Sequence, residues 1–201
     1  MQISEYFDSV ASFWDDDFSE AKAARIVAST VSIPRGGACV LDIGCGSGSM
    51  FLDLMESGAC EIEGVDISKK MADTAREKFS FDPRIHVENC DFLDFARPGF
   101  DVLMAFNSYQ HFPVPRLFLK KAKELLRPGG RLTVAFPYDR ERVNILSAIM
   151  PAGVARGLLN AEEEAAIWRE FFDIDCMCDN DGLFLLSGTA RERKKDHEEE
   201  L

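Results

Sequence analysis

The sequence predicts an α/β fold, in which helices cover both faces of a doubly wound, mostly parallel sheet of seven strands. From residue 38 to residue 136, short apolar runs alternate with segments whose apolar residues recur at helical spacing. Strands that are joined through crossover helices run parallel. Near the end of the chain, the hairpin turn signal Asp179-Asn180-Asp181-Gly182 separates two further strand-like runs. The sheet is therefore expected to finish with an antiparallel hairpin strand.

Seven segments have the pattern of strands. They cover residues 38–43, 61–66, 84–88, 101–106, 131–136, 170–178 and 183–190. The runs at 38–43 and 101–106 are almost wholly apolar, as expected of central strands that helices cover on both faces. The run at 84–88 is short and places Ile85 and Val87 on one face. This order of strands and helices is typical of a Rossmann-like sheet.

Three helices are expected between these strands, over residues 50–55, 69–79 and 116–126. Gly58 is expected to end the first helix, because glycine accepts the left-handed conformation at a helix end. Ser68 is positioned to cap the second helix, and Asp82-Pro83 ends it. After the third helix, Pro128-Gly129-Gly130 is expected to turn the chain into the fifth strand.

Two segments lie outside this alternation and are natural places for a cover over a substrate. Residues 4–31 read as two helices around Asp15-Asp16-Asp17, and residues 140–168 read as one or two helices interrupted by Pro151 and Gly153. The expected organisation is a single domain over 1–190, with a helical cover at 1–31, a core at 38–136, a substrate-cover insertion at 140–168 and a charged tail at 191–201.

Composition narrows the class of protein. The chain has 201 residues, is 46% hydrophobic and carries a formal net charge of −12. Polyanion binding normally needs clustered Lys and Arg, so a nucleic-acid partner is disfavoured. No apolar run approaches the roughly 18 residues that cross a bilayer, and the N-terminus lacks the pattern of a secretory signal. Six cysteines form no CxxC pair and predict no metal site, which favours a reducing, cytoplasmic setting.

The most informative motif is the glycine-rich turn that follows the first strand. Gly44, Gly46 and Gly48 are spaced G-x-G-x-G, whereas the dinucleotide fingerprint is G-x-G-x-x-G. A plain strand-helix turn would need one glycine. Three let a ligand approach bare N–H groups at a helix N-terminus. Asp66 closes the second strand, where an acid accepts hydrogen bonds from ribose hydroxyls. Together they predict a nucleoside cofactor.

This G-x-G-x-G turn, preceded by Val40-Leu41-Asp42, resembles the first motif of the class I S-adenosylmethionine-dependent methyltransferases of the small-molecule type. The segment Leu125–Leu132 also matches the turn before that family's fifth strand, where its role is structural. The resemblance implies S-adenosylmethionine as cofactor. It places Asp42 near the cofactor's amino group, Asp66 at the ribose and Asp91 at the adenine amine.

The resemblance implies further cofactor contacts. The methionine part lies over Gly44, Cys45, Gly46 and Gly48, the adenine is flanked by Cys90 and Phe92 with Ile67 and Met71 on its other face, and Asn107 is counted among the cofactor-binding residues. Met71 has a second interpretation, as a plain core residue of its helix.

The loop after the fourth strand, Phe106–Phe112, is expected to face the acceptor, because ligands bind beyond the carboxyl ends of parallel strands. His111 is the best candidate for a general base; the alternative is a structural histidine that closes the loop. Tyr109, Asn107 and Gln110 could orient a substrate hydroxyl or amine. The loop lacks an Asn-Pro-Pro-Tyr-like segment, which by the same resemblance weighs against methylation of nucleobase or glutamine amines.

The sequence thus favours an enzyme that transfers a methyl group to a small-molecule acceptor, with oxygen, nitrogen, carbon and sulfur nucleophiles all open. One alternative is a non-catalytic S-adenosylmethionine-binding protein. A second, an NAD-dependent oxidoreductase, is disfavoured by the glycine spacing and by the lack of a clear Tyr-x-x-x-Lys pair. Tyr6, Phe7, Phe13 and Trp14 either line the site, where aromatic rings can stabilise a sulfonium, or pack within their own helix.

Overall fold

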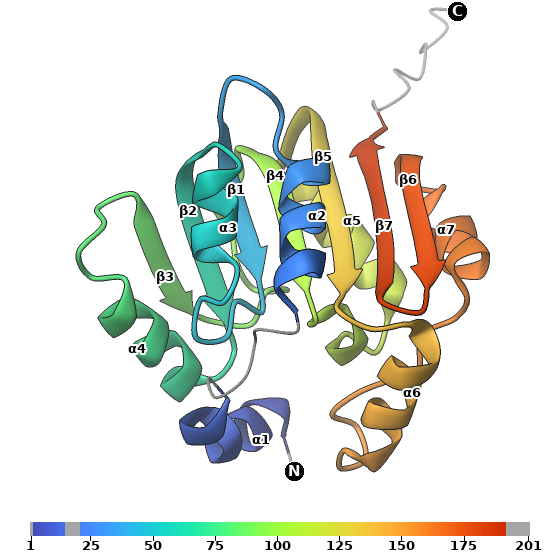
Figure 1. The fold of residues 1–201 in the computed structure, drawn as a ribbon, viewed down its shortest axis with the longest axis horizontal. Helices are drawn as coiled ribbons and strands as arrows, with labels where there is room; N and C mark the ends of the chain where they lie inside the picture. The colour runs from blue at the N-terminus through green and yellow to red at the C-terminus, as the bar shows by residue number, and fades with distance from the viewer. Residues whose placement is uncertain (1, 15–20, 192–201) are drawn as a thin grey trace, which may run out of the picture.

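The computed structural model of the chain describes residues 2–14 and 21–191. A seven-stranded sheet runs through its centre in the order β3-β2-β1-β4-β5-β7-β6 (Figure 1). The pairings among β1 to β5 are parallel, and β7 is antiparallel to both of its neighbours. This topology confirms the predicted α/β class, the Rossmann-like parallel core and the closing antiparallel hairpin.

The elements follow the predicted order. The strands are β1 (Ala38–Ile43), β2 (Ala59–Asp66), β3 (Ile85–Asn89), β4 (Phe100–Phe106), β5 (Leu126–Phe136), β6 (Phe172–Asn180) and β7 (Leu183–Ala190). The helices are α1 (Ile3–Val10), α2 (Lys22–Ser32), α3 (Phe51–Glu56), α4 (Lys69–Lys78), α5 (Pro115–Leu125), α6 (Arg140–Ile149) and α7 (Ala161–Trp168), with short 3-10 turns η1 (Ala11–Phe13) and η2 (Tyr109–His111).

One predicted turn is part of a strand. The segment Pro128-Gly129-Gly130 was expected to precede the fifth strand, but β5 already begins at Leu126, which pairs with Phe100. The next paired positions are Val102 and Arg131, so the intervening residues bulge out of the ladder. A proline that cannot donate to the ladder is tolerated at such an irregularity.

Helices cover both faces of the sheet, as the apolar central strands require. In Figure 1, α2, α3 and α4 lie on the near side, while α5 and α7 lie behind the sheet. Two apolar clusters fill the two layers. One contains Phe51 and Phe79 from the α3 and α4 side, and the other contains Phe118 and Trp168 from the α5 and α7 side. Burial on both faces explains why β1 and β4 read as continuous apolar runs.

Two helices lie beyond the ends of the strands. Figure 1 shows α1 and α6 at the edge of the sheet to which the arrowheads of the parallel strands point. The carboxylate of Asp8, on α1, accepts hydrogen bonds from Ser68 Oγ at 2.6 Å and from the Lys70 N–H at 3.1 Å. Ser68 Oγ in turn accepts from the Met71 N–H at 3.2 Å, which confirms its predicted role as the cap of α4. The helix cap therefore also anchors α1.

The segments predicted as covers form separate helices. Residues 140–168 contain α6 and α7, separated by an irregular stretch that includes Pro151 and Gly153. Helices also lie on both sides of the predicted Asp15–Asp17 break, although those aspartates and the tail beyond residue 191 lie outside the described residues. Within the described part of the chain, no helix is both long enough and apolar enough to span a bilayer.

Candidate functional site

The glycine turn after β1 has a left-handed backbone at each of its three glycines. The φ angles of Gly44, Gly46 and Gly48 are 68°, 55° and 85°, values that residues with a side chain rarely adopt. A Cβ on Gly44 would lie 2.7 Å from the Cβ of Ser108, and a Cβ on Gly48 would lie 2.7 Å from the ring of Phe79. The first glycine therefore allows two loops to meet, and the third allows α3 and α4 to pack.

A cavity of about 280 Å³ opens between this turn and the carboxyl ends of β2 and β4. Its volume is near the lower end of the range for small-molecule sites. Ten of the residues predicted to bind the cofactor line it: Gly44, Cys45, Gly46, Asp66, Ile67, Met71, Cys90, Asp91, Phe92 and Asn107. Phe7 and Trp14 of the N-terminal segment line it as well, so these aromatic residues face the site and do not only pack within their helix.

Two predicted residues do not line this cofactor cavity. A Cβ on Gly48 would meet the rings of Phe51 and Phe79, so helix packing explains why this position is a glycine. Asp42 lies behind the turn and is 1% exposed. Its Oδ2 atom has no hydrogen-bond partner among the described residues. Burial, helped by the charge of Asp66, raises the pKa of Asp42 to about 8. A cation placed next to this carboxyl group would favour its ionised form.

Asp66 joins the two elements that frame the cavity. Its Oδ2 accepts from the Gly46 N–H at 2.8 Å, and its Oδ1 accepts from the Ser68 N–H at 2.8 Å. Burial raises the pKa of Asp66 to about 6, against the opposing effect of these two hydrogen bonds. Each carboxylate oxygen has a second lone pair, so the side chain can hold the turn and still accept hydrogen bonds from a ligand.

The adenine-side residues predicted from β3 and α4 also meet at the cavity. Asp91 holds its own loop by accepting the Leu93 N–H at 2.9 Å. Met71 is 1% exposed and Phe92 is 3% exposed, so each belongs to the core and lines the cavity at the same time. Loss of hydration raises the pKa of the Cys90 thiol to about 12, which keeps it neutral beside an apolar ligand surface.

The loop after β4 brings His111 to the same cavity. His111 Nδ1 lies 2.8 Å from the carbonyl oxygen of Val154. Because a carbonyl can only accept, Nδ1 carries the proton and Nε2 keeps a free lone pair. Burial lowers the pKa of His111 to about 4, so the ring is neutral at pH 7. The two predicted roles of His111, a general base and a structural residue of the loop, are therefore compatible. The side chain holds the loop to Val154 through Nδ1 and still lines the cavity.

Tyr109 is a core residue, and the prediction that it orients a substrate is wrong. Its side chain is 0% exposed and does not line the cofactor cavity. Its hydroxyl donates to Glu164 Oε2 at 3.1 Å and accepts from Trp168 Nε1 at 3.3 Å. Burial raises the pKa of this phenol. The η2 turn rotates Tyr109 toward α7, on the opposite side of the loop from His111.

A buried ion pair that sequence reasoning missed holds the same loop in place. Arg156 donates its backbone N–H to the carbonyl of Gln110 at 2.9 Å and its Nε to the carbonyl of Phe112 at 3.1 Å. Its Nη1 lies 2.8 Å from Oε1 of Glu164, which is 0% exposed. The spacing of Ala161, Glu164 and Trp168 along one helix face was the signal for this burial.

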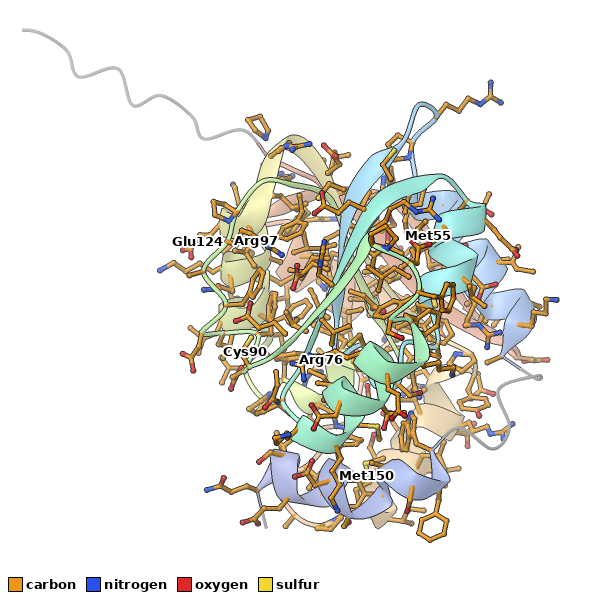
Figure 2. The ribbon with its side chains drawn as sticks, turned by 90° about the vertical axis from the view of Figure 1, so that its left-hand side faces the viewer. Met55, Arg76, Cys90, Arg97, Glu124 and Met150 are labelled. Atoms are coloured by element: carbon orange, nitrogen blue, oxygen red, sulfur yellow. The ribbon has the colours of Figure 1, made fainter. Side chains whose placement is uncertain are left out.

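A second cavity, of about 530 Å³, adjoins the first. We call it the acceptor cavity. Asn107 and Trp14 line both cavities. The acceptor cavity is otherwise lined by Tyr6, Phe13, Gln110, Tyr138, Val143, Leu146, Ser147, Ile149 and Met150. In Figure 2, Met150 lies at the lower end of the molecule, at the level of α1. The two cover segments therefore enclose a space next to the cofactor cavity.

Comparison with known proteins finds methyltransferases similar to part of this chain. The model of the Methyltransferase domain family matches residues 40–130, which include the glycine turn, Asp66 and Asp91. The chain is 30% identical over 132 residues to the 27-O-demethylrifamycin SV methyltransferase of Amycolatopsis mediterranei (strain S699), an alignment that covers 61% of this chain and 48% of that protein. Residues 40–130 therefore carry a methyltransferase domain similar to those of the class I S-adenosylmethionine-dependent enzymes.

Solved methyltransferase structures share this fold. The putative methyltransferase in a complex with the Haloferax volcanii Trm112 activator superposes with a TM-score of 0.76 at 18% identity, covering 92% of this chain and 98% of that one. The N-methyltransferase NodS from Bradyrhizobium japonicum, in complex with S-adenosyl-l-homocysteine, superposes with a TM-score of 0.72 at 15% identity, covering 96% and 100%. The chain spans about half the length of the curated relatives that it matches.

The residues of the cofactor cavity fit S-adenosylmethionine, the cofactor of the class I methyltransferases. The bare backbone of Gly44 and Gly46 leaves room for a polar chain, and Asp66 offers lone pairs where ribose hydroxyls would lie. The apolar surface of Met71 and Phe92 suits a flat base.

Proposed function

We propose that this chain transfers a methyl group from S-adenosylmethionine to a small-molecule acceptor. The observation that carries the proposal is that two neighbouring cavities share Asn107 and Trp14 in their walls, one beside the glycine turn and Asp66, the other lined by the cover segments. A methyl donor and a methyl acceptor need adjacent sites that share one boundary. The first cavity alone would support only the binding of a nucleoside.

The cofactor is proposed to lie along the first cavity. The turn from Gly44 to Gly48 and the acid Asp42 hold its methionine part, Asp66 binds the ribose, and Asp91 binds the adenine amine. Cys90, Ile67, Met71 and Phe92 enclose the adenine ring. When bound, S-adenosylmethionine supplies a methyl group on a cationic sulfur, which already makes the methyl carbon electrophilic.

The protein itself mainly positions the two reactants and excludes water from them. Phe7 and Trp14 line the cofactor cavity from the α1 side, and the hydrogen bonds of Asp8 hold that side against α4. Aromatic rings around a sulfonium also stabilise its charge. Asn107 stands at the boundary of the two cavities with φ at 52°, a left-handed backbone that asparagine tolerates and that is often found at functional sites.

His111 is proposed to accept the acceptor's proton. With a pKa of about 4 the imidazole is unprotonated at pH 7 but weakly basic. A weak base suffices for a hydroxyl whose proton becomes acidic as its oxygen gains the methyl group. The proton would pass to Nε2, because Nδ1 is committed to the carbonyl of Val154. The name of the rifamycin relative, an O-methylating enzyme, supports a hydroxyl acceptor.

We also propose a cellular compartment for the protein. All six cysteines are free thiols, which supports a reducing compartment such as the cytoplasm.

Release of S-adenosylhomocysteine tests the proposed reaction. The protein is incubated with S-adenosylmethionine and a panel of small alcohols, phenols, amines and thiols, and S-adenosylhomocysteine is quantified by mass spectrometry. Acceptor-dependent release supports methyl transfer. Tight binding of S-adenosylmethionine with no release across the panel would support the non-catalytic alternative. Binding of NAD in place of S-adenosylmethionine would overturn both.

A further inference from the structure

The backbone between residues 154 and 156 is hydrogen-bonded to the loop that carries His111. The carbonyl oxygen of Val154 lies 2.8 Å from His111 Nδ1. Arg156 donates its backbone N–H to the carbonyl of Gln110 at 2.9 Å and its Nε–H to the carbonyl of Phe112 at 3.1 Å. The two carbonyls that Arg156 binds thus belong to the residues on either side of His111. Three hydrogen bonds therefore fix the backbone and the ring of this histidine to one short segment.

The guanidinium group of Arg156 is itself held in place by buried side chains. Its Nη1 lies 2.8 Å from Oε1 of Glu164, and its central carbon lies 4.6 Å from the centre of the Tyr109 ring. The Tyr109 hydroxyl donates to the second carboxylate oxygen of Glu164 at 3.1 Å, and both of these residues are 0% exposed. Lysine could not make all of these contacts at once, because its single ammonium group lacks the planar fork of donors. The cluster therefore uses the shape of arginine as well as its charge.

The position of the Val154 carbonyl decides which ring nitrogen of His111 carries the proton. A histidine tautomer is set by the hydrogen bond that one of its ring nitrogens makes. While Nδ1 donates to Val154, the lone pair of Nε2 stays free, and the proposed proton transfer needs that lone pair. A shift of about 1 Å at Val154 would lengthen this bond beyond the range of a hydrogen bond. Whatever holds residues 154–156 against the loop therefore also keeps His111 able to accept a proton.

We propose that Arg156 is a positioning residue that holds His111 as the tautomer with its proton on Nδ1. This inference rests on the proposed function, in which His111 accepts the proton of the acceptor, and it names a residue on which that step depends. Arg156 is outside the lining of both cavities, so it acts only through the loop. Its two bonds to the loop and its ion pair with Glu164 keep the carbonyl of Val154 facing Nδ1.

NMR reads the tautomer of His111 without any acceptor, because protonated and unprotonated ring nitrogens differ in their nitrogen-15 chemical shifts. The labelled 201-residue chain is compared with Arg156→Lys at pH 7, and His111→Gln assigns the signals. The lysine keeps a positive charge beside Glu164 but removes the Nε donor to the carbonyl of Phe112. We expect essentially all wild-type molecules to carry the proton on Nδ1, and the lysine variant to lose at least about one third of that form.

Asn144→Leu is the matched control. The Asn144 side chain accepts the Leu158 N–H at 2.6 Å and donates to the Leu158 carbonyl at 3.0 Å. Its replacement removes two hydrogen bonds two residues beyond Arg156 and leaves the bonds to the loop intact, so the tautomer should not change. The inference is overturned by a wild-type protein with the proton on Nε2, by an unchanged tautomer in Arg156→Lys, or by an equal effect of Asn144→Leu.

Proton exchange in the wild-type protein decides the question if Arg156→Lys does not fold. The Arg156 Nε–H and the His111 Nδ1–H should exchange with solvent at rates within about threefold of each other, because one opening of the segment exposes both. A His111 proton that exchanges faster than this opens independently of Arg156 and contradicts the positioning role. Release of S-adenosylhomocysteine with the acceptor panel reports separately on the proposed function, so the failure of one proposal is distinguishable from the failure of the other.

Discussion

The buried carboxyl of Asp42 should make the ligand-free protein less stable as the pH rises. Its pKa is about 8 in the folded chain and about 3.9 in an unfolded one. Between these values the folded state holds a proton that the unfolded state has lost, so stability falls with rising pH by up to about 1.4 kcal/mol per unit. His111 acts in the opposite direction by a few tenths of a kcal/mol, because its pKa is lowered in the folded chain. From pH 6.5 to pH 7.5 the free energy of unfolding therefore falls by about 1 kcal/mol in total. For a chain of this size that lowers Tm by about 2–4 °C.

Thermal unfolding of the apoprotein at these two pH values measures the effect. The control is Asp42→Asn, which has nearly the same shape and cannot ionise, so the fall in Tm between pH 6.5 and 7.5 should be largely absent. A wild-type Tm that is flat or rising over this interval would refute the reasoning. The same slope in the asparagine variant would show that another group is responsible.

Three further perturbations have defined outcomes. Asp66→Ala removes a carboxylate at the cofactor cavity and should weaken S-adenosylhomocysteine binding by about 1.5–3 kcal/mol, and unchanged affinity in calorimetry would remove Asp66 from the site. Asp8→Ala should release α1 from α4 and speed S-adenosylhomocysteine dissociation about fivefold in stopped-flow fluorescence, whereas an unaltered rate would show that α1 does not retain the cofactor. Glu164→Gln leaves Arg156 as an uncompensated buried charge, so urea unfolding should show a loss of about 3–5 kcal/mol; a loss below about 1 kcal/mol would contradict a buried ion pair.

Much of the fold could be predicted because local signals agree with the tertiary arrangement. The apolar runs of β1 and β4 are buried on both faces, and Ser68 caps α4 as its position suggests. The glycine spacing was readable for a similar reason, since each of the three glycines needs a left-handed backbone that few other residues adopt. The bulge after Leu126 was not readable, because a Pro-Gly-Gly segment fits a free turn and a ladder irregularity equally well.

The site was less predictable where it depends on which way a short loop turns. Tyr109 and His111 are two residues apart in η2, yet one enters the core and the other the cofactor cavity. Position along the loop could not distinguish them, because the outcome is decided by contacts with α7. Arg156 and Glu164 were missed for a related reason: their pairing joins an irregular segment to a helix. Glu164 is the last of three consecutive acids in the first turn of α7, so composition does not distinguish it from its two neighbours.

Calorimetric titration of the 201-residue chain with S-adenosylhomocysteine, set beside a titration with NAD, tests the central claim most directly. The glycine turn, Asp66 and the adenine-side residues predict saturable one-to-one binding of S-adenosylhomocysteine and far weaker binding of NAD. Saturable binding of NAD with no binding of S-adenosylhomocysteine would contradict the account.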